Sequence, residues 1–240
     1  MNMPLVVSPI DIRRINITRQ RLAGPRPSPT AEGLLELVLD LGCVQLDPIS
    51  AVARNNLLVP WSRLGTYDPA IWDQLLWKDR SVFEYFAHAA AIVTTQDYPI
   101  HSHRMRAYRT STRPWVVQIR QWLKDNQQLL DNVMSTLQER GPVSSREFEE
   151  KAAVSWWSSG WTNDRNINRM LDFLWVQGII LVADRRSQLR YWDLTERVLP
   201  EWTPREELSS HEAVRRSAPR SRLRLLGCGL GLRAWVSPKP

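Results

Sequence analysis

The second half of the chain carries the feature that most constrains its fold, an ordered series of changes in hydrophobic periodicity. Apolar residues recur at helical spacing over Trp115–Leu123 and again over Leu129–Leu137. Gly141-Pro142 then interrupts the helical pattern, and Val143 follows as a short predicted strand. Two helices and a short strand are therefore expected to open this half.

The pattern continues with two more helices and a pair of strands. Ser145 is predicted to cap a helix over residues 146–153, and a longer helix is predicted over residues 164–177, where Gly178 ends it. Apolar and β-branched residues then predict two strands joined by a turn around residues 184–187: Ile179–Ala183 and Leu189–Trp192. The order helix, short strand, helix, helix, hairpin is typical of a winged-helix domain.

In a winged-helix domain the third helix commonly enters a DNA groove, and the hairpin touches the sugar–phosphate backbone. Here the predicted third helix has a polar side and the predicted turn carries two arginines. The sequence therefore predicts a DNA-binding surface made of Arg165, Asn166, Asn168 and Arg169 on the helix and of Arg185 and Arg186 at the hairpin tip.

Helix signals dominate the first half of the chain. Ser8-Pro9 predicts the start of a short helix that runs to about Leu22, and Thr30 caps a second helix that Gly42 ends. Two further predicted helices follow, and then one segment that fits a strand or a helix equally: Ser50–Leu58, Pro69–Trp77 and Val82–Val93.

Directly after Gly42, Cys43–Asp47 reads as a short extended segment. Side chains alternate along a strand, so Gln45 and Asp47 should share one face. Val44 and Leu46 should then share the other. The segment is therefore expected to present an amide and a carboxylate together.

The net charge of +7 and the pI near 9.9 suggest a polyanion as partner, but the charge is unevenly distributed. Seven of the 32 Lys and Arg residues lie in residues 213–240, which hold no acid, so 25 basic and 25 acidic residues balance in the rest of the chain. Two basic stretches remain as candidate phosphate-facing surfaces, or equally as solvated faces: residues 1–30 and Tyr98–Lys124.

No apolar run approaches the roughly 20 residues that cross a bilayer, and the N-terminal residues lack a signal-peptide pattern. Cys43 and Cys228 lie far apart, which predicts neither a disulfide framework nor a zinc knuckle. His101 and His103 have no further ligand cluster nearby in sequence. We expect a soluble, cytoplasmic protein that uses no metal or other cofactor.

Three segments resemble the winged-helix DNA glycosylases of the AlkZ and YcaQ (AlkX) type: GCVQLDPISAVARNNLLVPWSRLGTYDP (residues 42–69), VFEYFAHAAAIV (82–93) and YWDLTERVLP (191–200). In that family a Gln-aliphatic-Gln or Gln-aliphatic-Asp triplet marks the catalytic site. Gln45-Leu46-Asp47 matches the Asp version, which is typical of the YcaQ-like branch. Taken alone, the triplet fits equally a polar strand end where Asp47 bonds backbone amides.

The resemblance implies an enzyme that hydrolyses N-glycosidic bonds of alkylated bases, N7-alkylguanine in particular, in double-stranded DNA and that unhooks interstrand crosslinks. Such hydrolysis passes through a sugar with oxocarbenium character, so Asp47 is the candidate to stabilise positive charge or to deprotonate water. Gln45 can orient that water, because its amide both donates and accepts hydrogen bonds. A non-catalytic winged-helix DNA-binding protein or regulator is the alternative.

The same resemblance implies phosphate contacts at Arg54 and Arg63, although either arginine could form a structural ion pair. The matching segments also contain four residues that either line the site or belong to the core: Tyr67, Glu84, Tyr85 and His88.

The expected fold is α+β, mostly α, with tandem winged-helix domains in a monomer. We expect a first domain at 1–112 with the triplet and a second at 113–203. Residues 204–240 are expected to form a basic tail, a truncated or frameshifted remnant outside the resemblance, where the family has a third domain.

Overall fold

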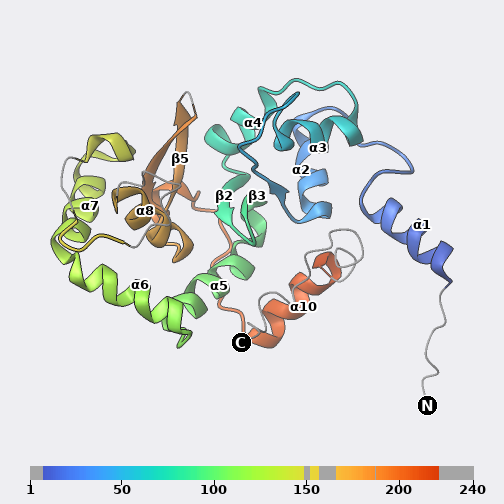
Figure 1. The fold of residues 1–240 in the computed structure, drawn as a ribbon. Coiled ribbons are helices and arrows are strands. Elements are labelled where there is room, and N and C mark those ends of the chain that lie inside the picture. Colours follow the sequence, from blue (N-terminus) through green and yellow to red (C-terminus); the bar gives the residue numbers. More distant parts are fainter. Residues whose placement is uncertain (1–7, 149–151, 157–165, 187, 222–240) are drawn as a thin grey trace, which may run out of the picture.

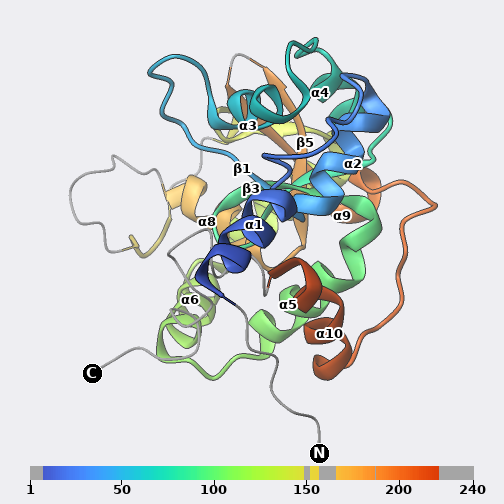
Figure 2. The ribbon, with the colours of Figure 1, turned by 90° about the vertical axis from the view of Figure 1, so that its right-hand side faces the viewer.

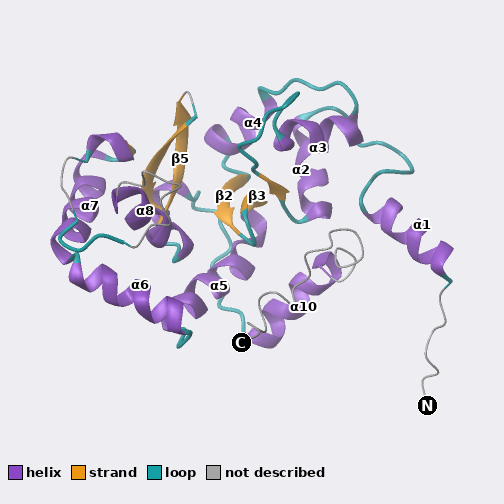
Figure 3. Ribbon diagram, viewed as in Figure 1, coloured by secondary structure: helices purple, strands orange, loops and turns teal. Residues whose placement is uncertain are grey.

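Two halves of the chain lie side by side in the computed structural model, which describes residues 8–148, 152–156, 166–186 and 188–221. Each half is built around a small antiparallel sheet of three strands, and helices surround both sheets (Figures 1 and 3). None of the helices in these ranges combines the length and the hydropathy needed to cross a bilayer.

The first half contains short helices and a sheet in the strand order β1-β3-β2. Thr30 caps α2 through a bond from the Gly33 amide, and Gly42 ends α2 in the left-handed conformation, as predicted. The elements are α1 (Pro9–Arg19), α2 (Ala31–Leu41), β1 (Val44–Gln45), α3 (Asn55–Leu64), α4 (Ile71–Asp73), a π-helical turn (Gln74–Lys78), β2 (Val82–Phe86) and β3 (Ala90–Thr94).

Two predictions for this half are corrected. The ambiguous segment Val82–Val93 is a hairpin of two strands. The helix predicted at Ser50–Leu58 begins only at Asn55 and continues through Pro60. Proline within a helix leaves a backbone carbonyl without its amide partner. Here the Trp72 indole donates to the Asn56 carbonyl at 3.1 Å, which satisfies that carbonyl.

Three helices connect the two sheets. A 3-10 turn (Thr95–Asp97) leads into α5 (Tyr98–Thr110), which is followed by α6 (Pro114–Asp125) and α7 (Gln127–Arg140). Hydrophobic periodicity predicts α6 and α7, whereas the residues of α5 stand out in the sequence only as a basic stretch. α5 buries Ile100, His101 and Met105 against the rest of the molecule.

The second sheet has the strand order β4-β6-β5. Its elements are β4 (Val143–Ser144), a 3-10 turn (Ser145–Glu147), α8 (Asn166–Val176), β5 (Ile180–Arg186) and β6 (Leu189–Leu194), followed by the short helix α9 (Thr195–Val198). The predicted hairpin is confirmed. The predicted cap at Ser145 is wrong, because Ser144 forms a capping box with Glu147 and the chain is extended again at Phe148. Residues 149–151 of that predicted helix lie outside the described ranges.

The first sheet separates two layers of hydrophobic core, one on each of its faces. Val44, Val82 and Ile92 pack beneath α2 in one cluster. Phe83 and Val93, from the alternate positions of the same strands, belong to a larger cluster that includes Met105 of α5 and residues of the second half, such as Leu137, Leu171, Leu174 and Leu181. The halves therefore share one core.

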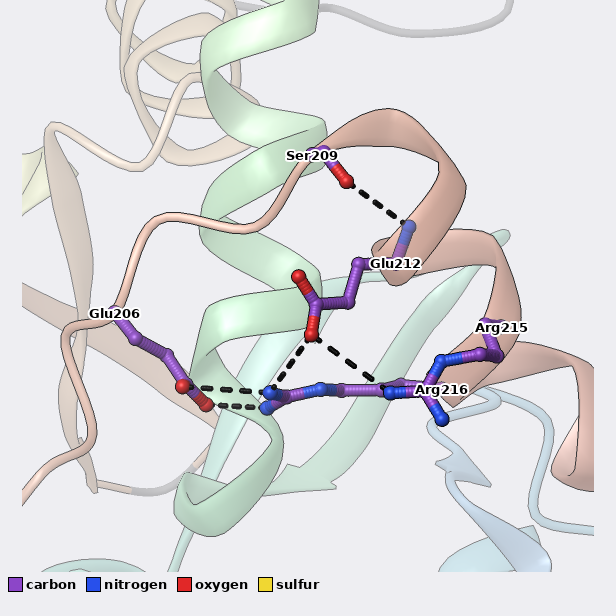
Figure 4. Close-up of polar contacts among 5 residues, drawn as sticks. All are labelled: Glu206, Ser209, Glu212, Arg215 and Arg216. Atoms are coloured by element: carbon purple, nitrogen blue, oxygen red, sulfur yellow. Dashed lines mark hydrogen bonds and ion pairs between the residues drawn. The ribbon is translucent and has the colours of Figure 1, made fainter.

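Residues 204–221, expected to belong to a basic tail, include a helix, α10 (Ser210–Ser221), that packs on α5. Leu208 and Ala213 form a small buried cluster with Ile100 of α5. Figure 4 shows Arg216 between the carboxylates of Glu206 and Glu212, and the Ser209 hydroxyl accepting from the Glu212 amide at 3.2 Å. These residues of the expected basic tail therefore form a helix that packs on the rest of the chain.

Candidate active site and DNA-facing surface

The predicted extended segment forms the edge strand of the first sheet. Val44 pairs with Ile92 and Gln45 with Ala91, and the Leu46 amide donates to the Ala90 carbonyl at 2.8 Å. Val44 is buried and Gln45 is exposed. The predicted alternation is present for these two residues, and β1 ends at Gln45, so Asp47 lies beyond the strand.

Strand pairing also determines the face on which Gln45 lies. Ala91 of β3 pairs with Gln45 on one side and with Tyr85 of β2 on the other. Directly paired residues project to the same side of a sheet. Tyr85 is part of the core shared with the second half, so Gln45 lies on the face where the two halves meet, at its open edge.

Asp47 follows directly and is half-buried. Its Oδ1 accepts a hydrogen bond from the Ile49 amide at 2.8 Å, which fixes the carboxylate in a turn around Pro48. Among the described residues, no group donates a hydrogen bond to the second oxygen, Oδ2. One oxygen thus holds the loop, as in a purely structural strand end, while the other is available for chemistry.

The loop after Asp47 returns to the same strand. The side-chain amide of Asn55, the first residue of α3, donates to the Gln45 carbonyl at 3.2 Å. Arg54 is the N-cap position of α3, and its side chain is partly exposed. Arg54 is thus the neighbour in sequence of Asn55, whose side chain bonds the triplet strand.

Arg63, predicted to contact phosphate or to form an ion pair, is bound to backbone carbonyls. The residue is 9% exposed, and its guanidinium donates to the carbonyls of Gln20 at 2.7 Å and of Val59 at 3.0 Å. Burial lowers the pKa of the guanidinium. Arg63 thus joins the segment after α1 to α3 and belongs to the framework.

Arg185 and Arg186 lie in β5 and not in the turn beyond it. Arg185 forms a bidentate ion pair with Glu84 of the first sheet, which engages two of its three guanidinium nitrogens within the protein. Burial lowers the pKa of Arg185, but the hydrogen bonds and charge of Glu84 outweigh that effect and raise it. Arg186 is 63% exposed, pairs with Asp184 at 3.0 Å and lies over the Tyr191 ring.

Asn168 of α8 is half-buried. It lines a surface pocket of about 270 Å³ between α8 and the hairpin, together with Asp172, Arg190 and Trp192. Arg190 pairs with Asp172 at 3.2 Å and stacks on the Trp192 ring. Arg165, the other predicted contact on this helix, lies outside the described residues.

The predicted DNA-facing elements of the two halves share one end of the molecule. In both Figure 1 and Figure 2 the far end of β5 and the loop between β1 and α3 point to the top of the view. A single duplex can therefore approach the triplet and the hairpin from one side.

Side-chain to backbone hydrogen bonds, which sequence reasoning missed, hold the halves together. The Tyr85 hydroxyl donates to the Val176 carbonyl at 3.1 Å, the Trp175 indole donates to the Glu84 carbonyl at 3.1 Å, and Arg109 donates to the Gln177 carbonyl at 2.8 Å. Burial raises the pKa of the Tyr85 hydroxyl well above its ordinary value. Because the acceptors are backbone carbonyls, no residue type in the sequence signals these bonds.

His101 and His103 have structural roles. His101 is buried against the rings of Phe83 and Tyr85, at centroid distances of 6.0 and 5.4 Å. Nδ1 of His103 lies 3.0 Å from the Leu208 carbonyl oxygen. In the described part of the chain, no cluster of three or more His, Cys, Asp or Glu side chains has a geometry that could hold a metal ion.

Comparison with known proteins gives two findings. The family model described as "DNA glycosylase AlkZ-like" matches residues 38–235, which includes most of the stretch that we expected to lie outside the resemblance. The solved structure of Streptomyces sahachiroi DNA glycosylase AlkZ has a similar fold, with a TM-score of 0.61 at 17% sequence identity. That match covers 88% of this chain and 56% of the Streptomyces chain. The family match extends over most of the sequence and contains the triplet strand, and the chain thus belongs to the AlkZ-like DNA glycosylase family.

Proposed function

We propose that this chain is a DNA glycosylase that hydrolyses the N-glycosidic bond of alkylated bases, N7-alkylguanine in particular, and that unhooks interstrand crosslinks. One observation carries the proposal: Gln45 and Asp47 lie at the open end of an edge strand, and one carboxylate oxygen of Asp47 is left available. Membership of the AlkZ-like family supports the same reaction class.

The chemistry needs few groups. An N7-alkylated guanine is cationic, so it leaves C1′ with the bonding electron pair and without prior protonation. Asp47 stabilises the oxocarbenium-like sugar and takes the proton of the water that bonds to C1′. Gln45 orients that water through its amide. The products are the free base and an abasic site.

We further propose that two winged-helix modules, residues 1–112 and 113–203, hold double-stranded DNA as a cytoplasmic monomer. The matching strand orders β1-β3-β2 and β4-β6-β5 support the repeated module. Arg54, Asn168 and Arg186 are the proposed DNA contacts with described positions, and Arg165 remains a proposed contact from the sequence. Arg63 and Arg185 leave this set because their guanidinium groups are bound within the protein.

The test is release of base from a duplex that contains N7-methylguanine, and unhooking of a nitrogen-mustard crosslink. The wild type should release base, and Asp47→Asn should lower the rate by at least about a hundredfold, as expected for loss of a catalytic carboxylate. Asparagine can still accept the bond from Ile49, so the loop should stay folded.

Asp68→Asn is the matched control. Asp68 also precedes a proline, and its Oδ1 accepts from the Ala70 amide at 2.9 Å in the same kind of turn. This variant should keep the wild-type rate. A folded wild type that binds DNA but releases no base would instead support the non-catalytic DNA-binding alternative.

A further inference from the structure

We infer that Arg185 is a positioning residue that acts through Glu84, because this ion pair fixes the β5–β6 hairpin against the sheet that carries Gln45 and Asp47. The inference rests on the proposed glycosylase function. By this inference Arg185 positions the hairpin, whereas its neighbour Arg186 contacts DNA.

The pair is well formed and its carboxylate end is buried, whereas the Arg185 side chain is 28% exposed. The Glu84 side chain is 1% exposed, and both of its oxygens accept from Arg185, Oε1 from Nε at 2.5 Å and Oε2 from Nη2 at 2.8 Å. A bidentate guanidinium–carboxylate pair fixes direction as well as distance. Glu84 belongs to β2 and Arg185 to β5, so the pair joins the two sheets.

A short path leads from this pair to the candidate site. Glu84 pairs with Ile92 of β3, and Ile92 pairs with Val44, the residue before Gln45. The Glu84 carbonyl also accepts the bond from the Trp175 indole of α8. One residue of β2 is thereby bonded to the triplet sheet, the hairpin and α8, and its displacement would move all three relative to one another.

Arg186 provides the contrast. Its guanidinium is mostly exposed, and the two residues that it contacts, Asp184 and Tyr191, both belong to the same hairpin. Since Arg186 lies at the end of β5, its exposed guanidinium can meet a phosphate. Arg185 cannot bind phosphate through the same nitrogens without giving up Glu84.

The position of the hairpin matters because the hairpin binds DNA in one half, while the base is released at Asp47 in the other half. Catalytic groups must lie within roughly 0.5 Å of their productive positions, and a displacement of about 1 Å can cost a hundredfold in rate. A hairpin that still binds DNA but sits differently against β2 would therefore present the damaged nucleotide wrongly to Asp47.

The experiment measures two quantities for Arg185→Gln, Glu84→Gln and Arg186→Gln: the single-turnover rate constant for base release at saturating enzyme, and the Kd for the same duplex at several salt concentrations. We expect Arg185→Gln and Glu84→Gln to lower the rate constant about tenfold and to change Kd less than twofold. Arg186→Gln should raise Kd severalfold and reduce the salt slope by about one.

Glu84 decides the outcome, because a side chain that is 1% exposed cannot touch DNA. A normal rate constant in Glu84→Gln, with weaker and less salt-dependent binding in Arg185→Gln, would overturn the inference and return Arg185 to the DNA surface. An unfolded fraction of the sample raises the total enzyme concentration needed for saturation but leaves the rate constant at saturation unchanged, so a folding defect is distinguishable.

If either single variant does not fold, Arg185→Lys and the double variant Glu84→Gln/Arg185→Gln take its place, since neither leaves a buried charge alone. Both should show the same slow rate constant with normal Kd, and a wild-type rate constant in both would overturn the inference. Absence of any release by the wild type would overturn the proposed function together with this inference.

Discussion

The two sheets of this molecule have the same strand order, but the residues after their shortest strands differ. In each half, a helix ends at a positive-φ glycine, Gly42 or Gly141. A strand of two residues begins two residues later and forms an edge of the sheet. In each sheet this short strand pairs with the second strand of the hairpin. The framework is thus repeated.

The residues after each short strand are used differently. After β4, Glu147 accepts from the Ser144 amide and hydroxyl, at 2.8 and 3.1 Å, and pairs with Arg140 at 2.8 Å, so its carboxylate is fully engaged. After β1, Asp47 accepts from one backbone amide and retains an available oxygen. The two carboxylates follow the same short-strand framework, but their hydrogen bonds differ: both oxygens of Glu147 are engaged, whereas only one oxygen of Asp47 accepts a bond from the described residues.

The largest effect is expected from a test of whether the two halves are independent. Leu37→Ala removes a fully buried side chain of α2, which packs against the first sheet, and Leu171→Ala removes one from the shared core. Each substitution should lower the free energy of unfolding by about 2–5 kcal/mol. Because the two core layers meet on one sheet, both variants should shift the same single transition in guanidinium chloride.

Far-UV circular dichroism and tryptophan fluorescence should report coincident unfolding curves in both variants. Two separate transitions, with Leu37→Ala shifting only one of them, would show that the halves unfold separately.

A smaller effect is expected at the glycines that join helices to strands. Gly141 (φ +78°, ψ −143°) has room for an added methyl group, whose nearest neighbour would be Asp193 Oδ2 at 3.9 Å, so Gly141→Ala should cost only backbone strain, about 1–3 kcal/mol. At Gly178 (φ +65°) the methyl group would overlap Met105 Sδ. Gly178→Ala should therefore cost an additional ~1–3 kcal/mol in urea unfolding. Equal losses would mean that Met105 moves aside freely.

The smallest effect concerns the capping box of the second sheet. The bond from the Ser144 amide, with further help from the Ser144 hydroxyl and Arg140, lowers the pKa of Glu147. A lowered carboxyl pKa stabilises the fold above the unfolded-state pKa, and this stabilisation is lost as the pH falls through the folded-state pKa. Glu147→Gln should therefore cost about 0.5–1 kcal/mol at pH 7 and much less in acid.

Thermal melts of Glu147→Gln and the wild type at pH 7 and in acid, below the folded-state pKa of Glu147, measure this difference directly. Base release by Glu147→Gln should stay at the wild-type rate, in contrast to Asp47→Asn. A loss of release comparable to that of Asp47→Asn would remove the distinction drawn between the two carboxylates.

Local chemistry is readable from the sequence where it acts within a few residues. Thr30 and Gly42 mark the ends of α2 because capping depends on the residue itself and its near neighbours. The exposed Gln45 beside the buried Val44 follows from strand alternation alone. The predicted cap of the second sheet is wrong by one residue, since Ser144 and Ser145 are equally able to cap and only the reach of Glu147 selects Ser144.

Contacts between distant residues are not readable in the same way. The sequence does not reveal α5 as a packed helix, because its arginines mask a narrow buried stripe that includes Ile100 and Met105. The sequence does not predict the ion pair of Arg185, because its partner, Glu84, lies 101 residues away in the sequence and on another sheet. An arginine at a hairpin end signals a cation, and only tertiary structure determines which anion it meets.

The shared core also sets a rule for building chimaeras of this chain with its relatives. Three contacts join the halves, and we call them the seam. Tyr85 bonds to Val176, Phe86 packs on Trp175, and Met105 lies against Gly178. A crossover placed between α5 and α6 would combine one side of that seam from this chain with the other side from a relative. Residues on the two sides would then not match. Chimaeras that exchange β2, α5, α8 and β5 as one set would keep the seam matched, and with it the register between the triplet strand and the hairpin.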